Sequence, residues 1–250
     1  MNAITATDLT KQFDGTTVVD RLDLVVPQGT VYGFLGPNGA GKTTTMRMLT
    51  TLTRPTSGNA TIMGEPITDR DAVRSSLGYL PEDPPVFDEL TGREQLKYFA
   101  RLRDIPAETA TERINFWLDR FDLAGDAGKR IEAYSKGMRQ KIGLIQALLH
   151  EPEVVFLDEP TSGLDPRAAR TVLDVISEVT DEGHTVFLST HILPVVEELA
   201  DLVGVLYQGR IVEEGDPQKL TGTLEAAEGT TLEDVFLSVT TDHGAPVMGE

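Results

Sequence analysis

The sequence predicts an α/β fold built around a parallel sheet with helices on both faces. Three short apolar runs indicate buried strands: "VYGFL" at 31–35, "VVFLD" at 154–158 and "TVFLS" at 185–189. Helical periodicity follows each run, and strands that alternate with amphipathic helices form parallel sheets covered on both faces. A block from about 91 to 149 contains helices and no convincing strand, so we interpret it as a helical insertion.

The segments before the insertion predict a hairpin, a strand–loop–helix unit and two further strands. The first two segments alternate apolar and polar residues around the turn Asp14–Thr16, as hairpin strands do. The expected elements are strands at 4–13, 18–26 and 31–35, a helix to about Leu52, and strands near Ala60–Met63 and Leu77–Leu80.

The character of the chain changes at "PEDPP", residues 81–85, where the insertion is expected to begin. Alternation of strands and helices resumes after it, and a polar end closes the chain. The expected elements are helices at 91–103, 108–120 and 136–149, a strand at 154–158, a helix at Pro166–Glu182, a strand at 185–189, a helix to about Asp201, a strand at 202–207 and a short helix near Leu232–Ser238.

The net charge is −18, from 22 basic and 40 acidic residues. Such a surface repels phosphate, so broad nucleic-acid binding is disfavoured, and attachment to an anionic membrane should need a protein partner. Lysine is scarcer than arginine. We interpret the composition as salt adaptation (halophilic); the alternative is a merely acidic protein of a mesophile.

The chain has 250 residues and no cysteine, which excludes disulfides and thiolate chemistry. No apolar run reaches the length of a membrane-spanning helix, and the N-terminal residues lack the basic and apolar regions of a signal peptide. We therefore expect a soluble, cytoplasmic protein.

"GPNGAGKTT" at 36–44 matches G-x-x-x-x-G-K-[ST] between a predicted strand and a predicted helix, which is the context that a phosphate-binding loop requires. Glycines let backbone N–H groups wrap a phosphate, and the helix N-terminus adds partial positive charge. Lys42 can reach the β- and γ-phosphates, and the Thr43 hydroxyl can bind Mg²⁺. The loop predicts a site for a nucleoside triphosphate.

"VVFLDEP" places Asp158 and Glu159 at the carboxyl end of a buried strand, where open α/β sheets bind ligands. Asp158 is predicted to hold Mg²⁺ and Glu159 to polarise the attacking water. The alternative is a helix cap and a solvated glutamate. "STH" ends the next strand, so His191 is predicted at the same edge as a γ-phosphate contact rather than a structural histidine.

"EAYSKGMRQKIGLIQALL" at 132–149 predicts a second anion site. Ser135 stands where a helix N-cap belongs, and Met138, Ile142 and Ile145 recur at helical spacing. Small residues at the start of this helix leave its N-terminus accessible to an anion.

Four motifs, in this order, make the chain resemble the nucleotide-binding subunit of ATP-binding cassette (ABC) transporters: "GPNGAGKTT", "YSKGMRQK", "FLDEPTSGLDP" and "STH". The resemblance runs from about Ile4 to Thr240. It implies a P-loop NTPase (ABC ATPase) core with a parallel sheet, an N-terminal antiparallel β subdomain and an inserted α-helical subdomain. It also implies an ATP-binding domain over 1–240, with the helical subdomain at about 84–149, and a polar tail over 241–250.

The resemblance implies roles for matching positions. Phe13 corresponds to the aromatic residue that stacks on adenine, although its pattern also fits a strand core residue. Asp165, in "SGLD", belongs to a segment that touches the partner subunit across the dimer. The positions implied in cofactor binding are Phe13, Gly36, Pro37, Asn38, Gly39, Ala40, Gly41, Lys42, Thr43, Thr44, Glu82, Ser135, Lys136, Gly137 and Asp165.

Two positions depart from the family pattern. The signature usually reads Leu-Ser-Gly-Gly-Gln; Ser135 and Gly137 match it, whereas Lys136 replaces a glycine with a cation. We expect Lys136 to contact the phosphates bound to the other subunit. Glu82 stands where the family has a glutamine. It keeps an oxygen ligand but adds a negative charge, and we expect it to sense Mg²⁺ as a metal ligand beside Thr43 and Asp158.

The resemblance implies an ATPase whose homodimer sandwiches two ATP molecules with Mg²⁺ and drives a separate membrane permease at the inner face of the membrane. "TLEDVFLSVT" at 231–240 is similar to the ending of exporter-type members. Two alternatives stay open: an ABC-type ATPase that acts on ribosomes or DNA, and a nucleotide-gated binding module without hydrolysis. A second cassette or a long coiled coil, typical of the first, is not apparent. Glu159 and His191 disfavour the second.

Overall fold

A computed structural model describes residues 1–223 and 236–237 of the chain. Its larger sheet has six strands in the order β10-β9-β3-β8-β7-β6, and every neighbouring pair except β10 with β9 is parallel. The strands are β3 (Val31–Leu35), β6 (Leu77–Leu80), β7 (Val154–Asp158), β8 (Thr185–Thr190), β9 (Leu202–Tyr207) and β10 (Arg210–Gly215). The predicted parallel α/β core is confirmed.

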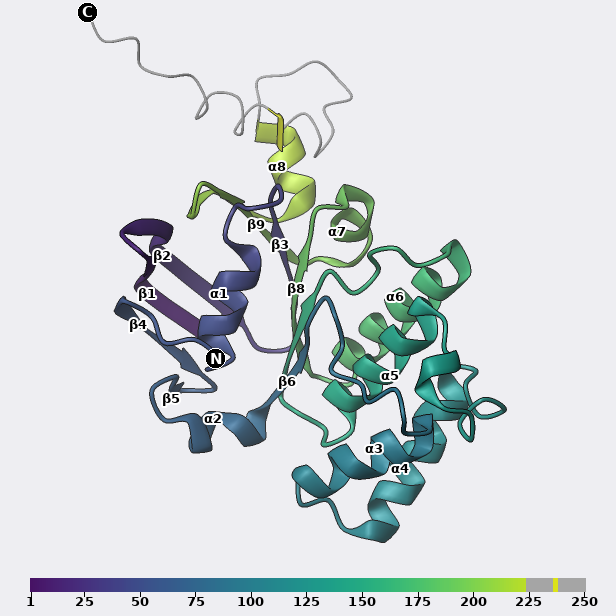
Figure 1. The fold of residues 1–250 in the computed structure, drawn as a ribbon. Coiled ribbons are helices and arrows are strands. Elements are labelled where there is room, and N and C mark those ends of the chain that lie inside the picture. The colour runs from purple at the N-terminus through teal and green to yellow at the C-terminus, as the bar shows by residue number, and fades with distance from the viewer. Residues whose placement is uncertain (224–235, 238–250) are drawn as a thin grey trace, which may run out of the picture.

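A second sheet is antiparallel and packs beside the first (Figure 1). Its order is β2-β1-β4-β5, with β1 (Asn2–Phe13), β2 (Thr16–Pro27), β4 (Ser57–Ile62) and β5 (Glu65–Pro66). Helix α1 (Lys42–Leu49) contacts β2 and β4 of the small sheet and β7 of the large one. The N-terminal antiparallel subdomain predicted from the sequence is therefore present, and α1 joins it to the core.

An aromatic cluster fills the space between the large sheet and α1. The ring of Phe187 on β8 stacks on Tyr32 at 5.3 Å between centroids, and it meets Phe34 at 5.2 Å and Phe156 at 5.5 Å. All four side chains are buried with the apolar face of the small sheet. Burial of this apolar area, together with Met46, Met48 and Leu49 of α1, stabilises the packing of α1 on the sheet.

The other face of the large sheet carries the remaining long helices. Helix α5 contacts β6, α6 contacts β8, and α7 contacts β3 and β8. Helices α3 and α4 pack against α5 at the outer end of this layer (Figure 1). The bounds are α3 (Gly92–Leu102), α4 (Ala107–Arg120), the 3₁₀ turn η1 (Ile131–Ala133), α5 (Lys136–Leu148), α6 (Pro166–Asp181) and α7 (Leu193–Leu199).

Besides η1, four short elements were not expected from the sequence: β5, α2 (Arg70–Ser76), β10 and α8 (Pro217–Thr223). Helix α2 buries only Val73, so its sequence has no apolar stripe to reveal it. Strand β10 is a polar edge strand that lacks alternation. The expected helix near Leu232–Ser238 and the tail at 241–250 lie outside the described residues, apart from 236–237, and the domain boundaries stay predictions.

None of the helices within residues 1–223 is long and apolar enough to cross a membrane.

Candidate active site

The loop between β3 and α1 is shaped by glycines at positions that other residues could hardly occupy. Gly39 has φ +81° and Gly41 has φ +111°, both in the left-handed region. A Cβ on Gly36 would lie 2.5 Å from the carbonyl oxygen of Leu206. Gly41 caps α1 without a side-chain hydrogen bond, so the first N–H groups of α1 stay available to an anion.

Lys42, the first residue of α1, is buried at the wall of this loop. Its Nζ donates a 2.7 Å hydrogen bond to the carbonyl oxygen of Gly36 and lies 3.4 Å from Oε1 of Glu159. The loop carbonyl therefore holds the ammonium group close to the acidic strand end.

A cavity of about 470 Å³ opens over the loop. It brings together residues from the ends of β3, β6, β7 and β8, because the carboxyl ends of parallel strands meet at one edge of the sheet. The lining residues are Val18, Pro37, Asn38, Gly39, Gly41, Lys42, Thr43, Thr44, Glu82, Glu159, Ser162 and His191.

Asp158, the last residue of β7, is 1% exposed. Ser189 Oγ donates a 2.5 Å hydrogen bond to its Oδ1, whereas its Oδ2 is buried with no hydrogen-bond partner among the described residues. Burial, together with the charge of Asp158, raises the pKa of Tyr79 to about 12, so this phenol stays neutral. A buried carboxylate oxygen without a partner among the described residues fits a hard cation such as Mg²⁺.

Glu159 follows directly, with φ +49°, an uncommon conformation for a residue with a side chain. Its amide donates to the carbonyl of Ser189 at 3.0 Å, and its side chain is 8% exposed. His191 Nδ1 lies 3.0 Å from Glu159 Oε2, and because a carboxylate only accepts, Nδ1 carries the proton and donates. The Glu159 carboxylate is thus held between an ammonium group and an imidazole at the edge of the cavity.

Most sequence-predicted site residues meet in this cavity. Gly36 and Ala40 shape the loop without lining it, and Asp158 lies buried at the adjoining strand end. Phe13 does not line it: the ring is 47% exposed at the end of β1, with Lys11 Nζ 4.8 Å from its centroid. The alternative that Phe13 is a strand core residue is therefore wrong, and its stacking on adenine stays a prediction.

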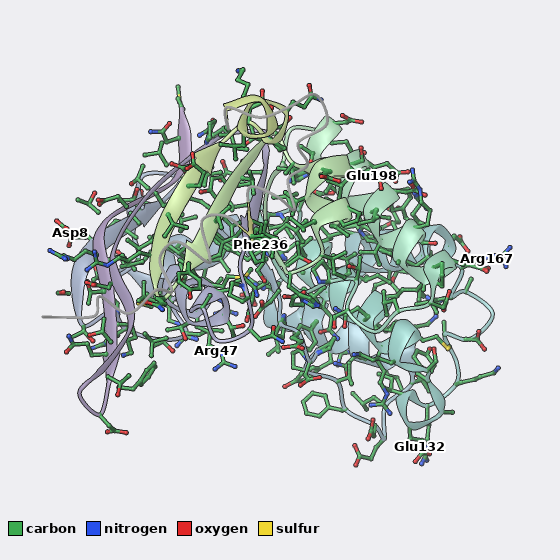
Figure 2. The ribbon with its side chains drawn as sticks, turned by 90° about the horizontal axis from the view of Figure 1, so that it is seen from above. Asp8, Arg47, Glu132, Arg167, Glu198 and Phe236 are labelled. Atoms are coloured by element: carbon green, nitrogen blue, oxygen red, sulfur yellow. The ribbon has the colours of Figure 1, made fainter. Side chains whose placement is uncertain are left out.

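The predicted second anion site lies at the N-terminus of α5, away from the cavity lining. Ser135 caps α5, since its Oγ accepts a 3.2 Å hydrogen bond from the Met138 amide, as predicted. Ser135 is exposed. Figure 2 shows Glu132 and Arg167, near this segment in the chain, on the side of the molecule away from Asp8.

The N-termini of α5 and α6 lie against each other. A Cβ on Gly137 would lie 3.6 Å from Cβ of Ala168. A Cβ on Gly163, which has φ +68°, would lie 2.6 Å from Nζ of Lys136. Lys136 therefore extends across the loop that precedes α6.

Asp165 caps α6 by accepting hydrogen bonds of 3.0 Å from the amides of Arg167 and Ala168. The bond from Ala168 is the main cause that lowers the pKa of Asp165. Within this chain the carboxylate is thus bound to its own helix.

Sequence reasoning missed two residues that line the cavity, Val18 and Ser162. Ser162 could have been found, because it follows the acidic pair by three residues at the same sheet edge. Nothing in the sequence around Val18 indicates a place in the site. It reaches the cavity because β2 packs against the loop, where its carbonyl oxygen would lie 2.8 Å from a Cβ on Gly41.

Comparison with known proteins agrees with this geometry. Residues 19–162 match the family model described as ABC transporter. The chain is 41% identical over 246 residues to the daunorubicin resistance ATP-binding protein DrrA3 of Streptomyces coeruleorubidus, a match that covers 98% of this chain and 77% of that protein.

Two further matches extend the comparison. The bacitracin transport ATP-binding protein BcrA of Enterococcus faecalis is 39% identical over 209 residues, which cover 83% of this chain and 67% of the relative. A solved ATP-binding subunit of an ABC transporter superposes with a TM-score of 0.88 at 30% identity, over 95% of this chain and 99% of the other.

Proposed function

The chain belongs to the ABC transporter family of ATP-binding proteins, and from this premise we propose that it hydrolyses ATP at the cavity over α1 to drive a separate membrane permease. One observation carries the proposal. The buried carboxylate of Glu159 lies at the cavity wall, with Lys42 Nζ 3.4 Å from one oxygen and His191 Nδ1 3.0 Å from the other. A binding module would have no need for a carboxylate held in this way.

Each residue has a definite part in the proposed reaction. Backbone N–H groups of the loop and α1 bind the phosphates, and Lys42 places its charge on the β- and γ-phosphates. Glu159 orients the attacking water and accepts its proton, and His191 holds the glutamate and contacts the γ-phosphate. Thr43, Asp158 and Glu82 would hold Mg²⁺, which when bound neutralises charge on the phosphates.

The variant Glu159→Gln tests this reaction. It keeps the shape of the side chain but cannot accept a proton, so we expect ATP affinity within a few-fold of wild type and turnover lower by roughly 100-fold or more. The matched control is Glu153→Gln, an exposed glutamate just before β7, which should turn over ATP normally. Normal turnover in Glu159→Gln would remove Glu159 as the catalytic base.

We further propose that two copies close on two ATP molecules. The N-terminus of α5 is capped by Ser135 and does not line the cavity of its own chain. This supports the proposal that a second chain brings this helix end to the phosphates. Phe13, Ser135, Lys136, Gly137 and Asp165 are assigned to ATP or to this interface on that basis. Glu159→Gln should form a dimer that ATP induces and that size-exclusion chromatography detects; a monomer at saturating ATP would contradict it.

The proposed partner is a membrane permease, with the chain peripheral at the cytoplasmic face and export as the direction. The names of the two relatives, a drug-resistance protein and a bacitracin transport protein, support export. A tagged copy purified from membranes should carry a hydrophobic membrane protein that stimulates its ATP hydrolysis. Recovery of ribosomes without such a protein would favour the alternative cytoplasmic ATPase.

The charge of −18 supports a proposal of salt adaptation. Dense surface carboxylates repel one another at low ionic strength, and salt screens this repulsion. Stability and turnover should therefore rise as KCl increases from tens of millimolar towards molar concentrations. Maximal folding and activity at low salt would contradict this proposal and leave the ATPase assignment intact.

A further inference from the structure

The geometry points to Ser189 as a positioning residue that orients both acidic residues of the site and thereby sets the affinity for the metal ion. Asp158 and Ser189 occupy matched positions on the neighbouring parallel strands β7 and β8. The inference rests on the proposed function, because it concerns the metal of that same site.

Two hydrogen bonds connect Ser189 to the acidic pair. The Ser189 hydroxyl donates a hydrogen bond to Oδ1 of Asp158 at 2.5 Å. The Ser189 carbonyl oxygen accepts a hydrogen bond from the amide of Glu159 at 3.0 Å. Ser189 is fully buried and Asp158 is 1% exposed, so water cannot replace either bond. One residue therefore holds the side chain of Asp158 and the backbone of Glu159.

The hydroxyl distinguishes the two oxygens of the Asp158 carboxylate. Oδ1 is satisfied by a short hydrogen bond to a charged group, which is stronger than a neutral one. Oδ2 is buried and has no partner within the described residues, a costly state that a cation would relieve. With Oδ1 bound, the carboxylate cannot rotate freely, and Oδ2 remains as the oxygen for the metal. Such outer contacts orient metal ligands and typically change metal affinity by about 10- to 100-fold.

The backbone bond has a second consequence. Glu159 adopts φ +49°, which costs energy for a residue with a Cβ. The bond from its amide to Ser189 helps to hold this conformation and keeps the carboxylate between Lys42 and His191. A substitution of the Ser189 side chain leaves this carbonyl in place, so the hydroxyl can be tested by itself.

A buried hydrogen bond could serve stability alone, and the test must separate that role from metal positioning. We would measure Mn²⁺ affinity by the electron paramagnetic resonance signal of free Mn²⁺, with ATP present, in the non-hydrolysing Glu159→Gln protein. Adding Ser189→Ala should weaken Mn²⁺ binding about tenfold. ATP affinity in EDTA should stay within twofold, because Ser189 does not line the cavity over the loop and its hydroxyl is bound to Asp158.

Two further variants make the result decisive. Ser189→Cys keeps the shape with a weaker donor, and it should weaken Mn²⁺ binding less than Ser189→Ala does. Thr185→Val is the matched control, because it removes another buried hydroxyl on β8. That hydroxyl accepts a 3.0 Å hydrogen bond from the amide of Gly29, at the opposite end of β8 from Ser189, and Thr185 does not line the cavity. It should lower thermal stability without changing Mn²⁺ affinity.

Each outcome decides the inference. Unchanged Mn²⁺ affinity in a folded Ser189→Ala protein overturns it, and so does an equal loss of ATP affinity in EDTA, which would show a structural role only. If Ser189→Ala does not fold, Ser189→Cys decides by the same criterion. Absence of any Mn²⁺ binding with ATP in the Glu159→Gln parent contradicts the proposed function itself, and the inference with it.

Discussion

Lys42 and Glu159 face each other at the cavity wall, with Nζ of the lysine 3.4 Å from Oε1 of the glutamate. Both side chains are more than nine-tenths buried, so each reduces the cost of burying the other's charge. Oε1 accepts no hydrogen bond among the described residues, and Nζ donates to the carbonyl of Gly36 instead. The contact is therefore electrostatic, and a phosphate group can compete for Lys42 without breaking a hydrogen bond to Glu159.

Lys42→Ala should abolish measurable ATP binding and also destabilise the empty protein. It removes the proposed phosphate contact. It also leaves the Glu159 charge buried with His191 as its remaining polar neighbour, at a cost of about 1–3 kcal/mol. Fluorescent ATP titration and urea unfolding measure the two effects. Lys42→Ala combined with Glu159→Gln should recover the stability and leave ATP binding lost. A double variant that is no more stable than Lys42→Ala would contradict the electrostatic coupling.

His191→Ala should slow ATP hydrolysis with a smaller effect on ATP affinity. His191 is the hydrogen-bond donor that holds Oε2 of Glu159, and without it the carboxylate proposed as the catalytic base loses its orientation. We expect kcat to fall by roughly 100-fold and KM for ATP to change by only a few-fold. The half-buried His184, which contacts the carbonyl of Pro152 elsewhere, gives the control variant His184→Ala. Equal kinetic losses in the two variants would contradict a specific role for His191.

Glu82→Gln tests how the departure from the family pattern affects Mg²⁺. Glu82 is exposed, lines the cavity and follows β6 by two residues. Its charge favours the metal and opposes the triphosphate, so removal of the charge should raise the Mg²⁺ concentration for half-maximal turnover several-fold. Steady-state rates of ATP hydrolysis at increasing Mg²⁺ concentrations measure this half-maximal value. Unchanged ATP affinity, turnover and Mg²⁺ dependence would exclude the proposed sensing role.

The fold was predictable where burial dictates the residues. Strands β3, β7 and β9 are covered on both faces, so each is a continuous apolar run and was located to the residue. Helix α2 and strand β10 escaped, because the first buries one residue and the second is a polar edge. Their positions depend on packing between segments far apart in the chain, and a local pattern of apolar and polar residues does not predict such packing.

The site was predictable where chemistry fixes the residue types. A phosphate loop needs glycine and lysine at set spacing, and the acidic pair needs a buried strand before it. Ser189 was not singled out, because a serine in an apolar run has many structural explanations. The role that we propose for it rests on the register of β7 with β8, which places Ser189 opposite Asp158.

Lys136 offers a test of the proposed dimer interface. Its side chain lies over Gly163 in the same chain, where a Cβ would meet Nζ at 2.6 Å. Lys136→Gly removes both the aliphatic chain and the charge of the side chain. Lys136→Met removes the charge and keeps an apolar chain of similar length. If the ammonium contacts phosphate bound to the other subunit, both variants should weaken the ATP-dependent dimer by roughly tenfold. Analytical ultracentrifugation in the Glu159→Gln background measures this.

The outcomes for Lys136 are distinct. If dimer affinity falls in Lys136→Gly but not in Lys136→Met, the interface depends on the aliphatic part of the side chain over Gly163 and not on its charge. Unchanged dimer affinity in Lys136→Gly would exclude the contact altogether.

His150 should make the protein less stable at mildly acidic pH. Burial is the main cause that lowers the pKa of His150 to about 4, and the charges of Arg103, Arg113 and Arg74 add to the effect. The ring Nε2 lies 2.9 Å from the carbonyl oxygen of Leu77 and donates to it in the neutral form. The folded state therefore resists protonation, whereas an unfolded chain takes up the proton near pH 6.5.

The sign of the effect follows from this difference. Between pH 6.5 and about 4 the unfolded state binds more protons than the folded one, so stability is complete above pH 6.5 and falls as pH decreases through this window. Partial exposure of the ring limits the loss to the order of 2 kcal/mol. Urea unfolding at pH 7, 6 and 5 should show a smaller loss for His150→Gln than for wild type, because glutamine keeps a donor and cannot be protonated. The two proteins differ only in this side chain, so parallel curves for the two would refute a role for His150.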